Sequence, residues 1–163
     1  MTALETLYAS GGQDDDRIVP TLELFCPAWS ESLYICQGFD DLTAKTEAGQ
    51  TRKFVAAGID VALPKRDNSG SQALTFAIDN VTGVAQQLID QALEARAKIG
   101  LVFRIYISSD LSGPAERPYR MTVLGGTMEG STVHLQAGYF DLINLAWPRR
   151  KYTLDFAPCL RYV

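Results

Sequence analysis

Near the middle of the chain, a strand pattern, a helix pattern and a second strand pattern follow one another without a break. In "ALTFAI", Leu74, Phe76 and Ile78 alternate with other residues, which is the two-residue period of a strand with one buried face. In "DNVTGVAQQLIDQALEARAKIG" the apolar positions recur at helical spacing, and "LVFRIYISS" alternates again. This succession limits the chain to folds that combine strands with at least one helix.

The helical pattern predicts one long amphipathic helix over residues 80–99. Asp79 or Asn80 is a candidate N-cap, and Gly100 is expected to end the helix. The pattern leaves open whether the flanking strands are parallel neighbours, as in a βαβ unit. The apolar stripe of this helix is expected to contain Val81, Val84, Ala85, Leu88, Ala92 and Ala95.

Upstream of this region, residues 21–29 and 32–39 predict a hairpin, with Pro27 placing the first strand at an edge or a bulge. If its turn centres on Glu31, residues whose numbers sum to 62 lie opposite each other. Cys26 then faces Cys36 across the hairpin.

Further strands are expected around a turn at residues 47–50, over residues 59–63, and on both sides of a turn at residues 128–131. Residues 2–10 have helical spacing and are followed by a Gly-Gly pair, which predicts a short N-terminal helix. We therefore predict an α+β fold, mostly antiparallel β, with one long amphipathic helix and a short N-terminal helix.

Composition excludes several functional classes. The 163 residues suffice for one domain with a real core, and hydrophobic residues at 47% are ordinary for a globular protein. A formal net charge of −4 argues against a protein whose affinity comes from neutralising phosphates. The acidic start, with no apolar run long enough to span a bilayer, predicts synthesis in the cytoplasm without a signal peptide.

Residues able to carry chemistry are few. Cys26, Cys36 and Cys159 are an odd number without C-x-x-C spacing, so we expect neither a disulfide framework nor a metal site. His134 is the only histidine, and no flanking motif pairs it with a thiol. The adjacent aspartates, including Asp40, lack the spacing of a calcium loop. We expect no catalytic residue, no cofactor and no enzymatic activity.

The last twenty residues interleave aromatic and basic side chains between two prolines, Pro148 and Pro158. The prolines and the residues before them restrict the backbone, which lowers the entropy lost when a partner orders the segment. We divide the chain into a domain over residues 1–143 and a C-terminal extended arm over residues 144–163. The arm could pack on its own domain or on a neighbouring subunit, and we favour the neighbour. The candidate subunit-interface residues are Trp147, Arg149, Arg150, Tyr152, Phe156, Arg161 and Tyr162.

Three stretches resemble a known family: "LETLYASGGQDDDRIVPTLEL", "SGSQALTFAIDNVTG" and "INLAWPRRKYTLDFAPCLRY". In this order they are similar to a family of tailed-bacteriophage and prophage proteins encoded among tail-assembly genes. That family is related in role to the minor tail protein L of lambda-like phages. The resemblance covers nearly the whole chain.

The resemblance implies a hub-type β domain that acts as a virion component. It would lie at the distal tail tip, or baseplate, of a phage with a long non-contractile tail, in a ring that links the tail tube to the central hub. The implied oligomer is a homotrimer, with the distal tail or tube protein, the central hub and the tape-measure protein as partners. The lambda-type relative carries a cysteine-rich iron-sulfur domain, and this chain lacks the four convergent cysteines for it.

Two other functions stay open at this point. One is a cysteine-dependent cell-wall peptidase or amidase, for which His134 is the only candidate base. The other is a tail-assembly chaperone that is absent from the finished virion.

Overall fold

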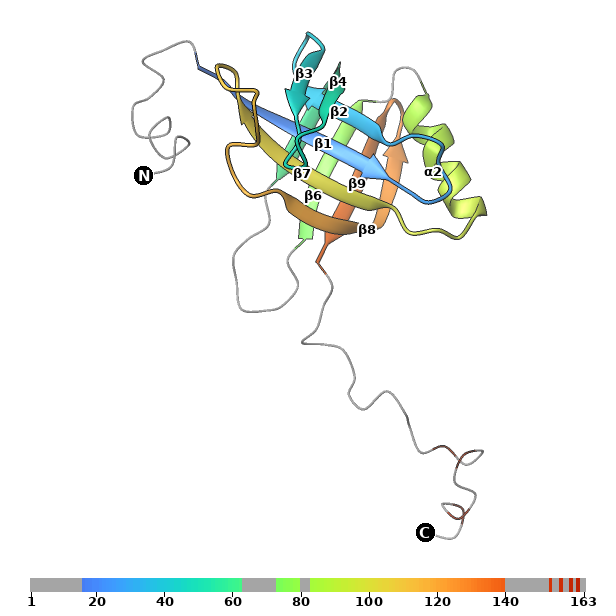
Figure 1. Ribbon diagram of the computed structural model, residues 1–163. Helices are drawn as coiled ribbons and strands as arrows, with labels where there is room; N and C mark the ends of the chain where they lie inside the picture. Colours follow the sequence, from blue (N-terminus) through green and yellow to red (C-terminus); the bar gives the residue numbers. More distant parts are fainter. Residues whose placement is uncertain are drawn as a thin grey trace.

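The computed structural model describes residues 16–62, 73–79 and 83–139, together with Thr153, Phe156, Cys159 and Arg161. In this part of the chain nine strands form one sheet, and one helix lies beside it (Figure 1). The elements are β1 (Ile18–Phe25), β2 (Leu33–Gln37), β3 (Leu42–Lys45), β4 (Thr51–Ala57), β5 (Ile59–Ala62), β6 (Ala73–Asp79), α2 (Val84–Glu94), β7 (Gly100–Ile107), β8 (Tyr119–Glu129) and β9 (Thr132–Gly138).

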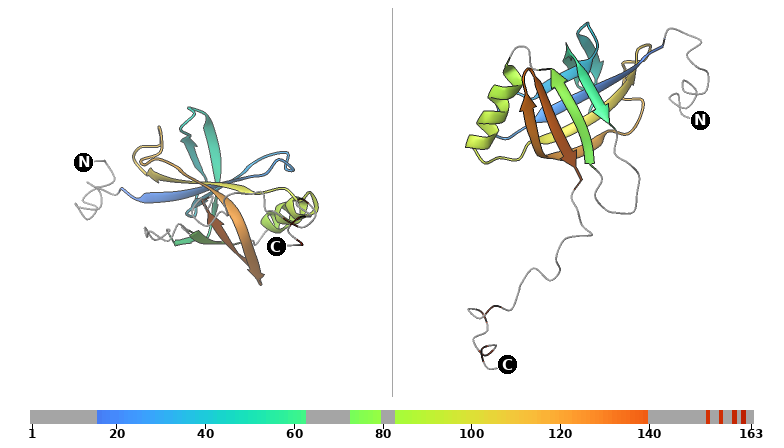
Figure 2. Two further views of the ribbon diagram at one scale, coloured as in Figure 1. Left: turned by 90° about the horizontal axis from the view of Figure 1, so that it is seen from below. Right: turned by 180° about the vertical axis from the view of Figure 1, so that it is seen from behind.

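The sheet curls back on itself. Its strand order is β3-β4-β2-β1-β7-β8-β9-β6-β5, and every neighbouring pair is antiparallel except β2 with β4. β4 and β5 stand near opposite ends of this order, yet only Gly58 separates them along the chain. The Gln37 side-chain amide donates to the Ile59 carbonyl at 2.9 Å, and the Asp79 backbone N–H donates to the Gly58 carbonyl at 3.0 Å. The chain link at Gly58 and the Gln37 bond join the two ends, whereas the Asp79 bond extends the β5–β6 pairing. Figure 2 shows the curled sheet from two further directions.

The inner face of the curled sheet holds the main core. Alternation places every second residue of several strands inside, as with Leu74, Phe76 and Ile78 on β6. Ile89 of α2 and Trp29 pack against this core from one end of the sheet. Its buried members are Leu22, Leu24, Ile35, Ile59, Leu74, Phe76, Ile78, Leu101, Phe103, Ile105, Met121, Val133, Leu135 and Ala137.

A second, smaller core lies on the outer face, where β3 and β4 cover β7. It is built on Phe54 and Tyr106, whose ring centroids are 5.9 Å apart, with Cys36 and Ala44 beside them. Because this hairpin covers the outer face, β7 is buried on both sides from Leu101 onward. A polar side chain on such a strand therefore lies inside a core, whichever face of the sheet it points to.

Several sequence predictions are confirmed. β6 buries the predicted alternate residues, and β3 and β4 flank the predicted turn, where Gly49 has a φ of 75°. β8 and β9 flank the predicted turn near Gly130, which has a φ of 61°. Glycine adopts this left-handed conformation without strain, so its position marks the turn in each case.

The predicted fold class, α+β with a long amphipathic helix and a short N-terminal helix, is wrong. The described residues are mostly β, with a single helix of 11 residues and one mixed sheet. The physical reason is that a sheet curled on itself buries its own inner face and needs no helical layer. The proposed N-terminal helix over residues 2–10 lies outside the described residues. β6 and β7 are not neighbours, so the strand-helix-strand succession forms no βαβ unit.

The long helix predicted over residues 80–99 ends early. α2 starts after Gly83, whose φ of 72° is left-handed, and it ends at Glu94. Arg96 adopts a φ of 49°, and the Ala97 N–H donates to the Ala92 carbonyl at 3.0 Å, which closes the last turn. The expected stop at Gly100 is wrong, because Gly100 already belongs to β7.

The predicted pairing of Cys26 with Cys36 is also wrong. Cys36 lies opposite Thr21, so paired residue numbers sum to 57 instead of 62. β1 ends at Phe25, and Cys26 belongs to a longer connection that includes a turn closed by the Trp29 N–H and the Cys26 carbonyl. The Trp29 indole N–H donates to the Leu88 carbonyl of α2 at 2.7 Å, so the loop follows the helix rather than turning tightly.

Candidate functional site

Most predicted interface residues lie outside the described part of the chain. These are Trp147, Arg149, Arg150, Tyr152 and Tyr162. Phe156 and Arg161 are described, and both are exposed to solvent. The interface role of this segment therefore stays a prediction.

The structure does not bring His134 together with a thiol. His134 is exposed on β9, whereas Cys36 is buried in the outer core on β2, and these strands are not neighbours. Burial raises the pKa of the Cys36 thiol, which disfavours the nucleophilic thiolate. Cys26 is buried beyond the end of β1, and Cys159 is exposed. The described residues contain no thiol–imidazole pair.

The buried Arg104 binds two carboxylates, one on β1 and one in the β3–β4 turn. Arg104 of β7 is only 4% exposed, and its Nη2 atom lies 2.7 Å from a Glu23 carboxylate oxygen. Its Nε and Nη2 atoms donate to the two Glu47 carboxylate oxygens at 2.7 and 3.2 Å. Glu47 also accepts from Arg120 at 2.5 Å, and the Tyr106 hydroxyl donates to the Lys45 carbonyl at 2.9 Å. These contacts fasten the β3–β4 turn onto β7.

The charges in this cluster stabilise one another. Burial acts to lower the pKa of the Arg104 guanidinium, but its bonds to Glu47 and Glu23 outweigh burial and leave that pKa raised. The hydrogen bond from Arg104 holds the pKa of Glu47 below its ordinary value. Among the described residues, the Arg104 Nη1 atom is a buried side-chain nitrogen without a hydrogen-bond partner. The cluster is a structural fastening, since its central cation is closed to solvent.

An open apolar groove lies between α2 and β8, and we call it the α2–β8 groove. It has a volume of about 550 Å³. Leu93 of α2 is 69% exposed and Leu124 of β8 is 65% exposed, while Met128 is also exposed. Its lining residues are Gln86, Ile89, Asp90, Ala92, Leu93, Ala97, Lys98, Ile99, Val123, Leu124, Gly125, Gly126, Thr127, Met128, Val133 and Leu135.

A β-bulge creates the strand side of this groove. The register between β8 and β9 shifts between Val123 and Gly125, which leaves Leu124 unpaired and exposed. Bulges commonly re-aim a side chain in this way. A Cβ on Gly126 would lie 2.5 Å from the His134 carbonyl oxygen, so only glycine lets β8 approach β9 this closely.

On the helix side, the position of the buried stripe of α2 explains why Leu93 faces the groove. Ala85 and Ala92 are the buried residues of α2, and Leu93 lies one position beyond Ala92. Its side chain therefore leaves the core-facing stripe and stands at the groove edge.

Sequence reasoning missed the groove residues, although signals for them were present. Leu93 is a large apolar residue outside the predicted stripe of the helix. In "TVLGGTM" two adjacent apolar residues, Val123 and Leu124, precede a Gly-Gly pair and break the strand alternation. Such breaks mark a bulge and an outward-facing apolar side chain.

Within the described ranges, no three His, Cys, Asp or Glu side chains gather in a way that could hold a metal ion. The helix that the structure describes is neither long nor apolar enough to cross a membrane.

The curled sheet with two cores and an exposed apolar groove defines a small β domain with a surface suited to protein contact. The chain belongs to the family described as Domain of unknown function (DUF1833), which it matches over residues 2–152. A search of curated proteins found no match.

Proposed function

We propose that this protein is a structural component of the distal tail tip of a bacteriophage with a long non-contractile tail. It joins the tail tube to the central hub through protein–protein contacts and catalyses no reaction. Its partners are further copies of itself, the distal tail or tube protein, the central hub and the tape-measure protein. Its location is the virion, after synthesis in the host cytoplasm.

The observation that carries an assembly role is the α2–β8 groove. Leu93, Leu124 and Met128 stand exposed around one concave apolar surface instead of being scattered singly. A contiguous exposed apolar surface is typical of a site of protein contact, because covering it removes apolar area from water. A protein partner in the groove would gain this stabilisation.

The tail context is supported by the three sequence stretches similar to tail-assembly proteins. Two of them, residues 4–24 and 69–83, fall inside the family match over residues 2–152. The third, residues 143–162, extends beyond it and contains the predicted interface residues.

The proposal is tested in the phage or prophage that carries the gene. Leu93→Glu places a charge in the groove, and Gln91→Glu places the same charge on an exposed position of α2 outside the groove lining. We expect mass spectrometry of purified particles to find the Gln91→Glu chain and wild type, and to find the Leu93→Glu chain strongly depleted. Absence of the wild-type chain from infectious particles would contradict a structural role and favour a chaperone.

Two further variants separate the arm and the enzymatic alternative. Deleting residues 147–163 is expected to leave a folded domain that is not incorporated into tails, and normal infectious particles would refute a role for the arm. His134→Ala is expected to leave infectivity unchanged, whereas a loss of infectivity with normal incorporation would favour a peptidase.

A further inference from the structure

The loop that joins β2 to β3, residues 38–41, presents a fully exposed phenylalanine. We call it the Phe39 loop. Phe39 is the most exposed of the large hydrophobic side chains in the described part of the chain. In a single copy this ring contributes nothing to the core, although burying it would be strongly favourable.

The exposure of Phe39 is held in place by bonds on both sides of it. Before it, the Gln37 side-chain amide donates to a carbonyl of β5 at 2.9 Å. After it, an Asp41 carboxylate oxygen accepts from the Ala56 N–H at 3.0 Å, and the other lies 2.8 Å from the Lys53 ammonium. Because the loop is anchored before any partner binds, less conformational entropy is lost when a partner covers Phe39.

We propose that Phe39 of one copy inserts into the α2–β8 groove of a second copy of this chain. The inference rests on the proposed assembly role and deepens it by naming the occupant of the groove. An apolar projection and an apolar depression on the same molecule are complementary surfaces for self-association.

The sizes of the two surfaces agree. A closed apolar cavity of about 150 Å³ admits benzene, and the α2–β8 groove measures about 550 Å³. The groove therefore has room for the phenyl ring of Phe39 together with neighbouring atoms of its loop.

The charges beside the two surfaces are also complementary. Phe39 is followed by the exposed Asp40, and the exposed Lys98 lines the groove. Asp41 is already paired with Lys53. Asp90 lines the groove as well, so an acidic loop is favoured beside Lys98 and disfavoured beside Asp90. Asp40 is therefore expected to lie beside Lys98 when the Phe39 loop enters the groove.

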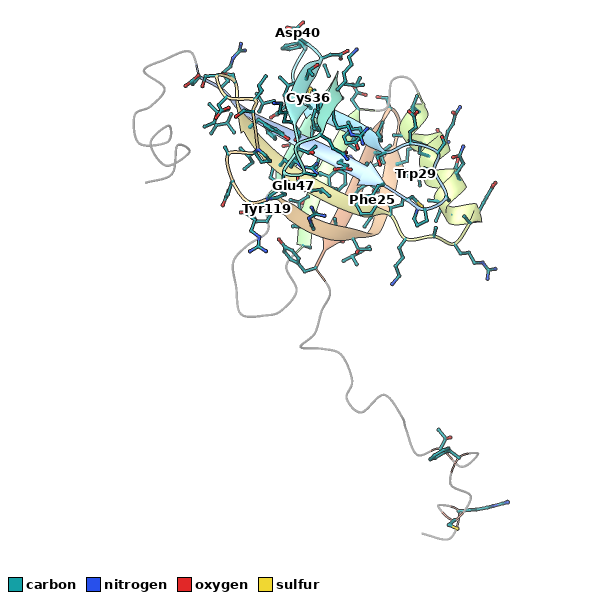
Figure 3. The ribbon with its side chains drawn as sticks, viewed as in Figure 1. Phe25, Trp29, Cys36, Asp40, Glu47 and Tyr119 are labelled. Atoms are coloured by element: carbon teal, nitrogen blue, oxygen red, sulfur yellow. The ribbon has the colours of Figure 1, made fainter. Side chains whose placement is uncertain are left out.

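Phe39 lies away from the groove of its own copy. In Figure 3 Asp40, the next residue, lies at the tip of the β2–β3 loop, apart from α2, whose residues line the groove (Figure 1). Each copy therefore offers one projection and one groove at different places. Repeating such a head-to-tail contact produces a ring if the rotation closes, and a filament if it does not.

The test measures self-association of the full chain by sedimentation velocity, up to about 100 µM, where even a weak contact is populated. We expect wild type to form oligomers. Phe39→Ser and Leu124→Glu should each weaken association by at least about tenfold, the effect expected at a central contact residue. Phe39→Leu and Gln91→Glu should associate like wild type, and far-UV circular dichroism should show all variants folded, since each changed side chain is exposed.

Mixing the two defective variants identifies the contact itself. The Phe39→Ser chain keeps its groove, and the Leu124→Glu chain keeps its projection, so together they can form one intact contact. We expect a one-to-one complex that does not grow further.

Three results would overturn the inference: a wild-type chain that stays monomeric at the highest concentration, normal association of Phe39→Ser, or failure of the mixture to form a complex. The proposed function has a separate readout. If Leu93→Glu still abolishes incorporation into particles, the groove binds another tail protein and only the self-contact is wrong.

Discussion

Replacing Glu47 by Gln tests whether the Arg104 cluster fastens the β3–β4 turn to the sheet. Glu47 lies at the turn between β3 and β4, and Arg104 lies inside β7 (Figure 3 labels Glu47). Glutamine has nearly the same shape as glutamate, so the substitution removes the negative charge and one acceptor oxygen without creating a cavity. One of the two bonds from Arg104 is then lost.

The structure limits the size of the effect. Breaking a fully buried ion pair costs about 3–5 kcal/mol, and a hydrogen bond to a charged group contributes about 1.5–3 kcal/mol. Glu47 is 29% exposed, so water screens part of the interaction, and Arg104 retains its contact with Glu23. The contact with Arg120 adds little, because Arg120 is largely exposed. We expect Glu47→Gln to lower the free energy of unfolding by about 1.5–3 kcal/mol at neutral pH.

The effect should depend on pH in a defined direction. The bond from Arg104 lowers the pKa of Glu47 in the folded protein below its ordinary value of 4.5. The stability that ionised Glu47 contributes is therefore complete above that ordinary value and is lost as the pH falls through the lowered pKa. The difference between wild type and Glu47→Gln should shrink over the same acid range.

Urea unfolding followed by far-UV circular dichroism, at neutral pH and in steps into the acid range, measures this difference. Glu31→Gln makes the same chemical change at an exposed position and should stay within about 0.5 kcal/mol of wild type. A Glu47→Gln chain as stable as wild type at neutral pH, or a difference that persists unchanged in acid, would refute the reasoning.

Three further predictions concern packing, the helix loop and the thiols. Gly126→Ala should lower the free energy of unfolding by about 1–3 kcal/mol, because the added Cβ meets the β9 backbone. The Cβ added by Gly125→Ala meets no atom within 4 Å, so this control should change the free energy of unfolding little, and thermal unfolding of both variants measures the difference. Trp29→Phe should destabilise by about 1 kcal/mol or more through loss of the indole bond to α2, measured by urea unfolding. Cys159 should react with a thiol reagent far faster than buried Cys36, whose raised pKa disfavours the thiolate, and equal rates would contradict the described burial.

Local patterns predicted a large part of the fold. The alternation in "ALTFAI" correctly assigned the buried face of β6, and the turns near Gly49 and Gly130 were placed correctly. These features depend on residues close together in the chain, where side-chain direction and turn conformation follow from the sequence directly.

Sequence predictions were wrong where contacts between residues far apart in the chain decide the structure. The register of β1 with β2 depends on the loop held to α2 by Trp29, and the fold class depends on the sheet curling back on itself at Gly58. The helix ended early because Arg96 adopted a left-handed conformation, which a search for glycine alone does not find. The stripe prediction succeeded for Ala85 and Ala92 and failed for the exposed Val84.

The candidate site was the least predictable part. The sequence directed attention to the residues after 143, while the groove forms from α2 and β8, which meet only in the folded chain. Leu93 and Leu124 are ordinary apolar residues in the sequence, and only their exposure marks them. Phe39 likewise reads as part of a strand, and the structure places it at the tip of an anchored loop.

The sequence by itself determined which residues alternate, where two tight turns lie, and that the middle of the chain holds a helix between strands. Only the tertiary structure decided which strands pair, that β7 is buried on both faces, and that Arg104 stands inside the outer core. The physical reason is that periodicity sorts side chains between two faces of an element, whereas burial depends on what covers each face. In this protein the β3–β4 hairpin covers one face of β7, and the α2–β8 groove is left uncovered.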